Sequence, residues 1–85
     1  MLRQIEVTGN QQKTLEEMYH KKIHEINAKL KMFNAKYNNW EDVEDRVKQN
    51  YTREEYKRFF IDRALAERSV YIQKLKNVRK GFVLE

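Results

Sequence analysis

The chain has 85 residues, of which 40% are hydrophobic and 36% are charged, with no cysteine, no proline and two glycines. The lack of cysteine excludes disulfides and thiolate metal sites, and the near absence of helix breakers favours one small all-α domain over residues 1–85. The formal net charge of +5 fits a polyanionic or acidic partner, and the absence of any membrane-length or signal-like apolar run predicts a cytoplasmic protein.

The N-terminal residues 2–8 alternate in polarity, which is typical of a short strand, and Gly9 then marks a turn. Thr14 with Glu17 three residues later is a capping-box pattern, so we expect the first long helix over 14–37. Apolar residues then recur at alternating steps of four and three, which predicts a single stripe along one helix face. The stripe consists of Tyr19, Ile23, Ile26, Leu30, Phe33, Tyr37 and Trp40.

Asn39 interrupts this helix and is a good N-cap for a short second helix over 40–50. Thr52 and Glu55 repeat the capping box and predict a third helix over 53–80. Its apolar stripe consists of Tyr56, Phe60, Ala64, Tyr71, Leu75 and Val78, widened by Ile61, Leu65 and Ile72. Two long helices of similar length with short connections indicate an antiparallel helical hairpin or three-helix bundle.

Gly81 is a natural C-cap for the third helix. The apolar residues 82–85 that follow have the composition of a strand. Two interpretations stay open here: this segment pairs with residues 2–8, or Phe82 docks on the helices instead.

Two histidines stand one helical turn apart, at His20 and His24, the spacing at which imidazoles share a divalent metal. A third ligand and the His-Glu-x-x-His spacing are missing, so the favoured interpretation is two solvated polar residues. Paired acids begin the second and third helices, where carboxylates stabilise the helix dipole. Since no phosphate loop or nucleophile motif is present either, we predict a protein that is not an enzyme, with no cofactor and no metal.

Basic residues concentrate in two segments that an antiparallel hairpin brings together, which predicts a continuous basic edge. One interpretation is contact with nucleic-acid phosphates. The other is a solvated flank that pairs with acids such as Asp62 and Glu67 on the facing helix. The members of this edge are Lys21, Lys22, Lys29, Lys36, Lys74, Lys76, Arg79 and Lys80.

Adjacent apolar residues at Phe59-Phe60 and Met32-Phe33 cannot both face one neighbour, so one of each pair is expected to serve another surface. That surface is either the middle helix or a second molecule. The resulting interface anchors are Met32, Phe33, Tyr37, Trp40, Phe59 and Phe60.

These features lead to the hypothesis of a non-enzymatic interaction module, a small regulator or inhibitor that binds a protein partner and forms a homodimer. The first alternative is a nucleic-acid-binding protein that uses the basic edge. The weaker alternative is a site for a small anionic ligand such as a nucleotide, lined by Tyr19, Lys22 and Arg79.

Overall fold

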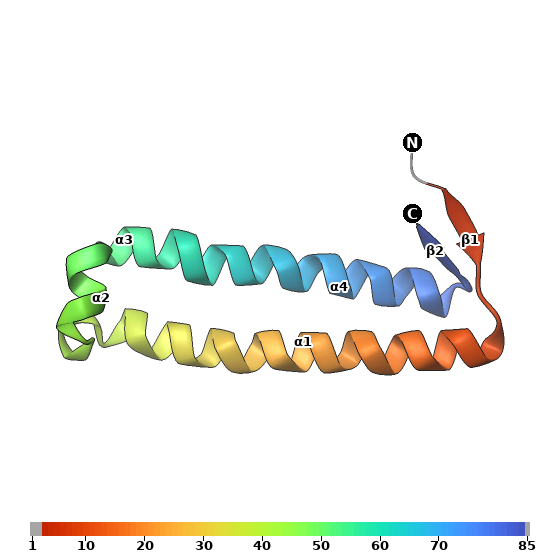
Figure 1. Cartoon of the computed structure of the whole chain (residues 1–85), viewed down its shortest axis with the longest axis horizontal. Helices are drawn as coiled ribbons and strands as arrows, with labels where there is room; N and C mark the ends of the chain where they lie inside the picture. The colour runs from red at the N-terminus through yellow and green to blue at the C-terminus, as the bar shows by residue number, and fades with distance from the viewer. Residues whose placement is uncertain (1–2, 85) are drawn as a thin grey trace.

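The computed structural model describes residues 3–84, which form a long helical hairpin (Figure 1). Helix α1 (Gly9–Asn38) is one arm. The other arm runs antiparallel to it and consists of α3 (Arg53–Tyr56), the π-helix η2 (Lys57–Asp62) and α4 (Arg63–Arg79). The molecule measures 50 × 26 × 16 Å, and its two arms lie side by side in a single layer (Figure 1).

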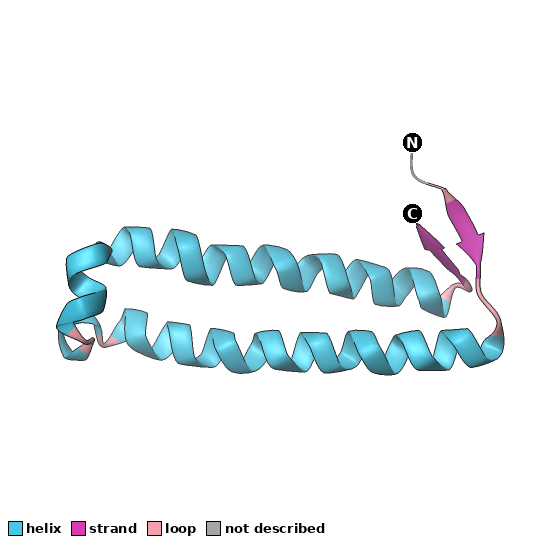
Figure 2. Cartoon of the chain, viewed as in Figure 1, coloured by secondary structure: helices cyan, strands magenta, loops and turns pink. Residues whose placement is uncertain are grey.

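The two ends of the hairpin are built differently (Figure 2). At the closed end the chain turns through the 3₁₀-helix η1 (Trp40–Asp42) and α2 (Asp45–Asn50). At the open end β1 (Gln4–Glu6) and β2 (Phe82–Leu84) form an antiparallel two-stranded sheet. The predicted all-α hairpin with short terminal strands is therefore confirmed. Residues 2 and 85, the outermost residues of the predicted strands, lie outside the described residues.

Helix α1 begins at Gly9, so the predicted start at Thr14 and the predicted turn at Gly9 are wrong. The capping box that forms belongs to Thr8: the Gln11 N–H donates to the Thr8 hydroxyl (3.2 Å), and the Thr8 N–H donates to Gln11 Oε1 (3.0 Å). The Thr14 hydroxyl instead donates to the Asn10 carbonyl inside the helix (3.1 Å). The helix therefore begins at the capping box of Thr8, which lies closer to the strand, and not at Thr14.

The predicted helix over 40–50 is divided in two, because the chain is extended at Val43 and buries that side chain. Asn39 is not the side-chain N-cap that the sequence predicted. Its amide Nδ2 donates to the Ala35 carbonyl (3.1 Å), so it satisfies the C-terminal end of α1 instead.

The second arm starts as predicted, with a capping box between Thr52 and Glu55. The π-helix that follows has one extra residue in its turn. The buried side chains Tyr56 and Ile61 are therefore five residues apart, one more than in an α-helix. Leu65 and Ile72 were expected to widen the buried stripe, but they are 39% and 37% exposed. That part of the prediction is wrong because the facing stripe of α1 is too narrow to cover them.

The core lies along the middle of the hairpin, where Ile26 and Leu30 of α1 meet Ile61 and Ala64 of the second arm. Leu75 and Val78 extend it toward the open end, and Val78 has no exposed surface. All of the α1 stripe predicted from the sequence is buried or half-buried: Tyr19, Ile23, Ile26, Leu30, Phe33, Tyr37 and Trp40.

Gly81 links α4 to β2 in a left-handed conformation, with φ at +96°. Its N–H donates to the Val78 carbonyl (2.8 Å), and its carbonyl accepts from the Val7 N–H (3.0 Å). We expect Gly81→Ala to lower the free energy of unfolding by about 1–2 kcal/mol, because a Cβ is disfavoured at positive φ. Urea denaturation measures this effect.

Gly9→Ala is the matched control, since Gly9 lies in the first turn of α1 and an added Cβ meets nothing within 4 Å. It is expected to leave stability unchanged or to raise it by up to about 1 kcal/mol. Equal losses for the two variants would contradict the role given to the Gly81 conformation.

Candidate functional site

The sheet stands over the open end of the hairpin (Figure 1). The sheet, α1 and α4 together line an open groove of about 960 Å³. The sequence did not predict this groove, because its walls come from four segments whose meeting depends on the sheet. The strand-like ends were the only signal for it. The apolar side chains that line it are Ile5, Val7, Leu15, Val70, Val83 and Leu84.

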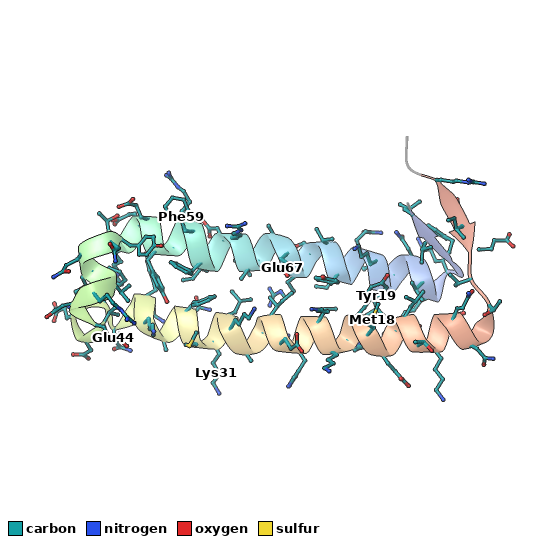
Figure 3. All side chains as sticks on the ribbon, in the orientation of Figure 1. Met18, Tyr19, Lys31, Glu44, Phe59 and Glu67 are labelled. Atoms are coloured by element: carbon teal, nitrogen blue, oxygen red, sulfur yellow. The ribbon has the colours of Figure 1, made fainter. Side chains whose placement is uncertain are left out.

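A few polar groups also face the groove. Asn77 is 8% exposed, and its Oδ1 accepts from Gln73 Nε2 at 3.0 Å. Lys74 Nζ lies 5.3 Å from the centre of the Tyr71 ring, a cation–π distance. The Tyr71 ring in turn contacts Tyr19, with 6.1 Å between centroids, and Figure 3 shows Tyr19 between the two arms.

Of the residues predicted for an anionic-ligand site, Tyr19 lines the groove. Lys22 and Arg79 lie outside its lining. Arg79 instead approaches α1, with its Nη2 3.2 Å from His20 Nε2 and its Nε 3.6 Å from Glu16 Oε1. The structure therefore does not bring the three residues together around one cavity.

The predicted basic edge is divided between two sides of the hairpin. Lys74 lines the groove, whereas Arg79, about 140° further around α4, contacts Glu16 and His20. His24 is exposed, and within residues 3–84 no group of three or more histidine or acidic side chains is placed to hold a metal ion. The other exposed members of the edge are Lys21, Lys22, Lys29, Lys76 and Lys80.

One flank of α1, about 100° around the helix from its buried stripe, combines methionines with lysines. Met18 and Met32 are each 48% exposed, and the heptad-spaced lysines lie three or four residues from them on the same side. We name this surface the Met–Lys face; it consists of Met18, Lys22, Lys29, Met32 and Lys36. One exposed acid, Glu25, lies among the three lysines, so the face keeps a net positive charge.

The ion pairs in the described part of the chain are Arg79–Glu16 and Arg46–Glu44. The pairing expected between the lysine flank and Asp62 or Glu67 is thus not formed. Lys22 and Lys29 are exposed, and Lys36 is half-buried. The Met–Lys face consequently presents its positive charge outward.

Most of the predicted interface anchors pack inside the closed end. The Phe33 and Phe60 rings lie 5.4 Å apart, and Trp40 lies 5.4 Å from Tyr56. Met32 and Phe59 remain 48% and 47% exposed. The expectation that one member of each adjacent pair is left out of the core is confirmed.

Tyr37, the remaining anchor, is also held within the fold. The Arg53 guanidinium lies 4.5 Å from the centre of its ring. Arg53 Nε donates to the Tyr37 carbonyl at 3.0 Å, near the C-terminal end of α1. This contact joins the two arms beside the aromatic cluster.

Burial raises the pKa of the Tyr56 phenol above its ordinary value of 10.0, and the side chain is 3% exposed. The folded state thus holds this proton more strongly than the unfolded chain, so stability falls as the pH rises past 10.0 toward the folded-state pKa. We expect Tyr56→Phe to reduce this alkaline loss of Tm relative to the wild type. Thermal melts from neutral to alkaline pH measure it, with Tyr51→Phe as the control, and an unchanged alkaline loss in Tyr56→Phe would contradict the assignment.

No helix in the described part of the chain is both long enough and apolar enough to cross a membrane. Comparison with protein-family models, curated proteins and solved structures finds no match to this chain.

Proposed function

We propose that the protein is a non-enzymatic interaction module that self-associates and acts as a small regulator or inhibitor by binding a protein partner. The observation that carries the proposal is its accessible surface of 6796 Å². A compact monomer of 10.5 kDa exposes about 5,400 Å². The surplus, about 1,400 Å², exceeds the roughly 800 Å² that each partner buries in a standard interface.

The surplus arises from the architecture. Each arm of the hairpin buries one stripe against the other arm. In a body 16 Å thick, no further layer among residues 3–84 covers the remaining faces of the arms. Large apolar side chains consequently stay exposed along both arms. They are Met18, Met32, Phe59, Leu65, Val70 and Ile72, and Leu84 of β2 is exposed as well.

The Met–Lys face supports a partner of specific chemistry. Methionine side chains adapt to varied apolar surfaces, and the flanking lysines favour negative charge around such a contact. The complementary partner is an acidic protein surface with an apolar centre. By covering that surface, the hairpin would block its other contacts, as a regulator or inhibitor does.

A pull-down from a lysate of the source cells tests the proposal, with and without nuclease. The variant Met18→Ser/Met32→Ser removes the apolar part of the face, and His24→Ser/Lys31→Ser changes two exposed residues of α1 outside it. Figure 3 shows Lys31 pointing away from the other arm.

We expect the wild type and the control to capture the same protein after nuclease treatment, and the methionine variant to lose most of it. Circular dichroism of each variant verifies that the helices are intact. Equal capture by both variants would refute the Met–Lys face as the contact.

Nucleic-acid binding is a second candidate, favoured by the outward, unpaired lysines of α1 and the net charge of +5. Fluorescence anisotropy with short DNA and RNA duplexes across a salt series tests it. Phosphate contact requires affinity to fall steeply with salt and to weaken in Lys22→Gln/Lys29→Gln. No binding at low salt, or binding with a flat salt dependence, excludes this candidate.

A further inference from the structure

Strand β2 has a free outer edge. The Val7 N–H donates to the Gly81 carbonyl, and the register pairs Ile5 with Val83. In an antiparallel ladder every second pair of facing residues exchanges hydrogen bonds, so Ile5 and Val83 form such a pair. The N–H and C=O groups of Phe82 and Leu84 therefore point away from β1. Among the described residues the sheet has no third strand to meet them.

These outward groups are self-complementary. Two β2 strands can pair antiparallel in a register that includes all three residues of Phe82–Leu84 from each copy. Phe82 of each copy then lies opposite Leu84 of the other copy. Each of these pairs exchanges both of its backbone hydrogen bonds. Val83 then faces Val83 of the second copy across a two-fold axis, which is the isologous arrangement of a C₂ dimer.

The side chains favour the β2 edge over the free edge of β1. Pairing through β2 brings together Phe82 and Leu84, both apolar, and Leu84 is 45% exposed in the hairpin. Pairing through β1 would instead set Gln4 against Glu6 of a second copy. Charged and polar side chains of this kind protect an edge strand from association, whereas β2 carries none.

We infer that β2 pairs antiparallel with β2 of a second copy to form a four-stranded intermolecular sheet. This dimer deepens the self-association in the proposed function and uses part of the surplus surface described there. Ile5 and Val83 line the groove from one face of the sheet, so the combined sheet presents an unbroken apolar row over the grooves of both copies. A two-stranded sheet is marginal by itself, and four strands relieve that weakness.

Engineered cysteines test the contact directly, because the chain has no cysteine of its own. Residues facing each other in a non-hydrogen-bonded pair have Cα atoms about 4.5 Å apart, within the range of about 4.4–6.8 Å that a disulfide spans. Val83→Cys is therefore expected to oxidise to a covalent dimer. The control is Ile5→Cys, which lies on the same face of the sheet but three strands from its counterpart.

We expect Val83→Cys to cross-link about tenfold faster than Ile5→Cys or more, because pairing raises the effective concentration of the facing thiols. Non-reducing gel electrophoresis over time measures both rates at one protein concentration.

Proline variants supply a second readout. Leu84→Pro removes an outward N–H from β2, and Gln4→Pro, its partner in the register, removes an outward N–H from β1. Light scattering is expected to find a dimer for the wild type and Gln4→Pro but a monomer for Leu84→Pro, with equal helix content in all three.

The outcomes separate this inference from the wider proposal. A wild-type dimer in which Ile5→Cys cross-links faster, or in which Leu84→Pro still dimerises, overturns the β2 contact and leaves self-association standing. A monomeric wild type at all accessible concentrations overturns both this dimer and self-association. Binding of a different protein is judged separately by the pull-down.

Discussion

Replacing Leu30 with alanine is expected to lower the free energy of unfolding by about 2–5 kcal/mol, the range observed for emptied core positions. Leu30 is 5% exposed and packs with Ile26, Ile61 and Ala64 in the central core. A domain of this size has only roughly 3–5 kcal/mol of net stability, so we expect most Leu30→Ala molecules to be unfolded at 25 °C.

Urea denaturation followed by circular dichroism measures this loss, with Met32→Ala as the matched control. Met32 lies two residues further along α1 and is 48% exposed, so its truncation should change stability by no more than about 0.5 kcal/mol. A comparable loss in the two variants would mean that the core is not where the structure places it. Self-association adds stability with protein concentration, so both variants are compared at one concentration.

Single-residue deletions in the second arm are expected to have opposite outcomes. Deleting Glu67, an exposed residue of α4, turns the two halves of its buried stripe by about 100° relative to each other. Tyr71 and Val78 can then no longer face α1 together with Ile61. We expect this variant to lose its cooperative thermal transition.

Deleting Arg58, an exposed residue of the π-helix, removes the extra residue of that turn instead. Tyr56 and Ile61 then stand four residues apart, which is the spacing of neighbours on one face of an ordinary α-helix. This variant is expected to keep the wild-type Tm or exceed it. Thermal melts of the two deletions provide the comparison, and failure of both variants to fold would show that the π-helix does not supply the extra residue.

The architecture could be predicted from the sequence because its signals are local and strong. The stripe along α1 keeps its alternating spacing from Tyr19 to Trp40, and every member is at least half-buried. Thr52 and Gly81 mark the beginning and the end of the second arm with residues whose backbone preferences are specific. Such features constrain a structure of few elements almost completely.

The details that the sequence did not predict depend on competition between similar local signals. Thr8 and Thr14 each begin a capping-box pattern, and pairing of the preceding strand with the residues around Gly81 favours the earlier one. Phe60 and Ile61 are both apolar, and only the facing surface of α1 decides which is fully buried. The π-helix results from the burial of Ile61 in place of Phe60, and no sequence pattern indicates it separately.

The groove and the division of the basic edge could not be predicted for a related reason. Both depend on rotation of α4 about its own axis, which sets Lys74 toward the sheet and Arg79 toward Glu16. The clustering of charged residues along the sequence does not predict this angle of rotation. The free edge of β2 was likewise not evident until the hydrogen-bond register assigned Phe82 and Leu84 to the outer side.

The pairing of Gln4 with Leu84 also determines the order in which the hairpin assembles. Contacts near the closed end join residues close in sequence, whereas the sheet joins opposite ends of the chain and carries the largest loop-closure entropy. The sheet should therefore form last in folding and open first in the native state. In a single copy, amide hydrogen exchange would then be fast at Ile5 and Val83, while Leu30 exchanges only on global unfolding. The surface inferred to join two copies is thus the most readily opened part of a copy that stands alone.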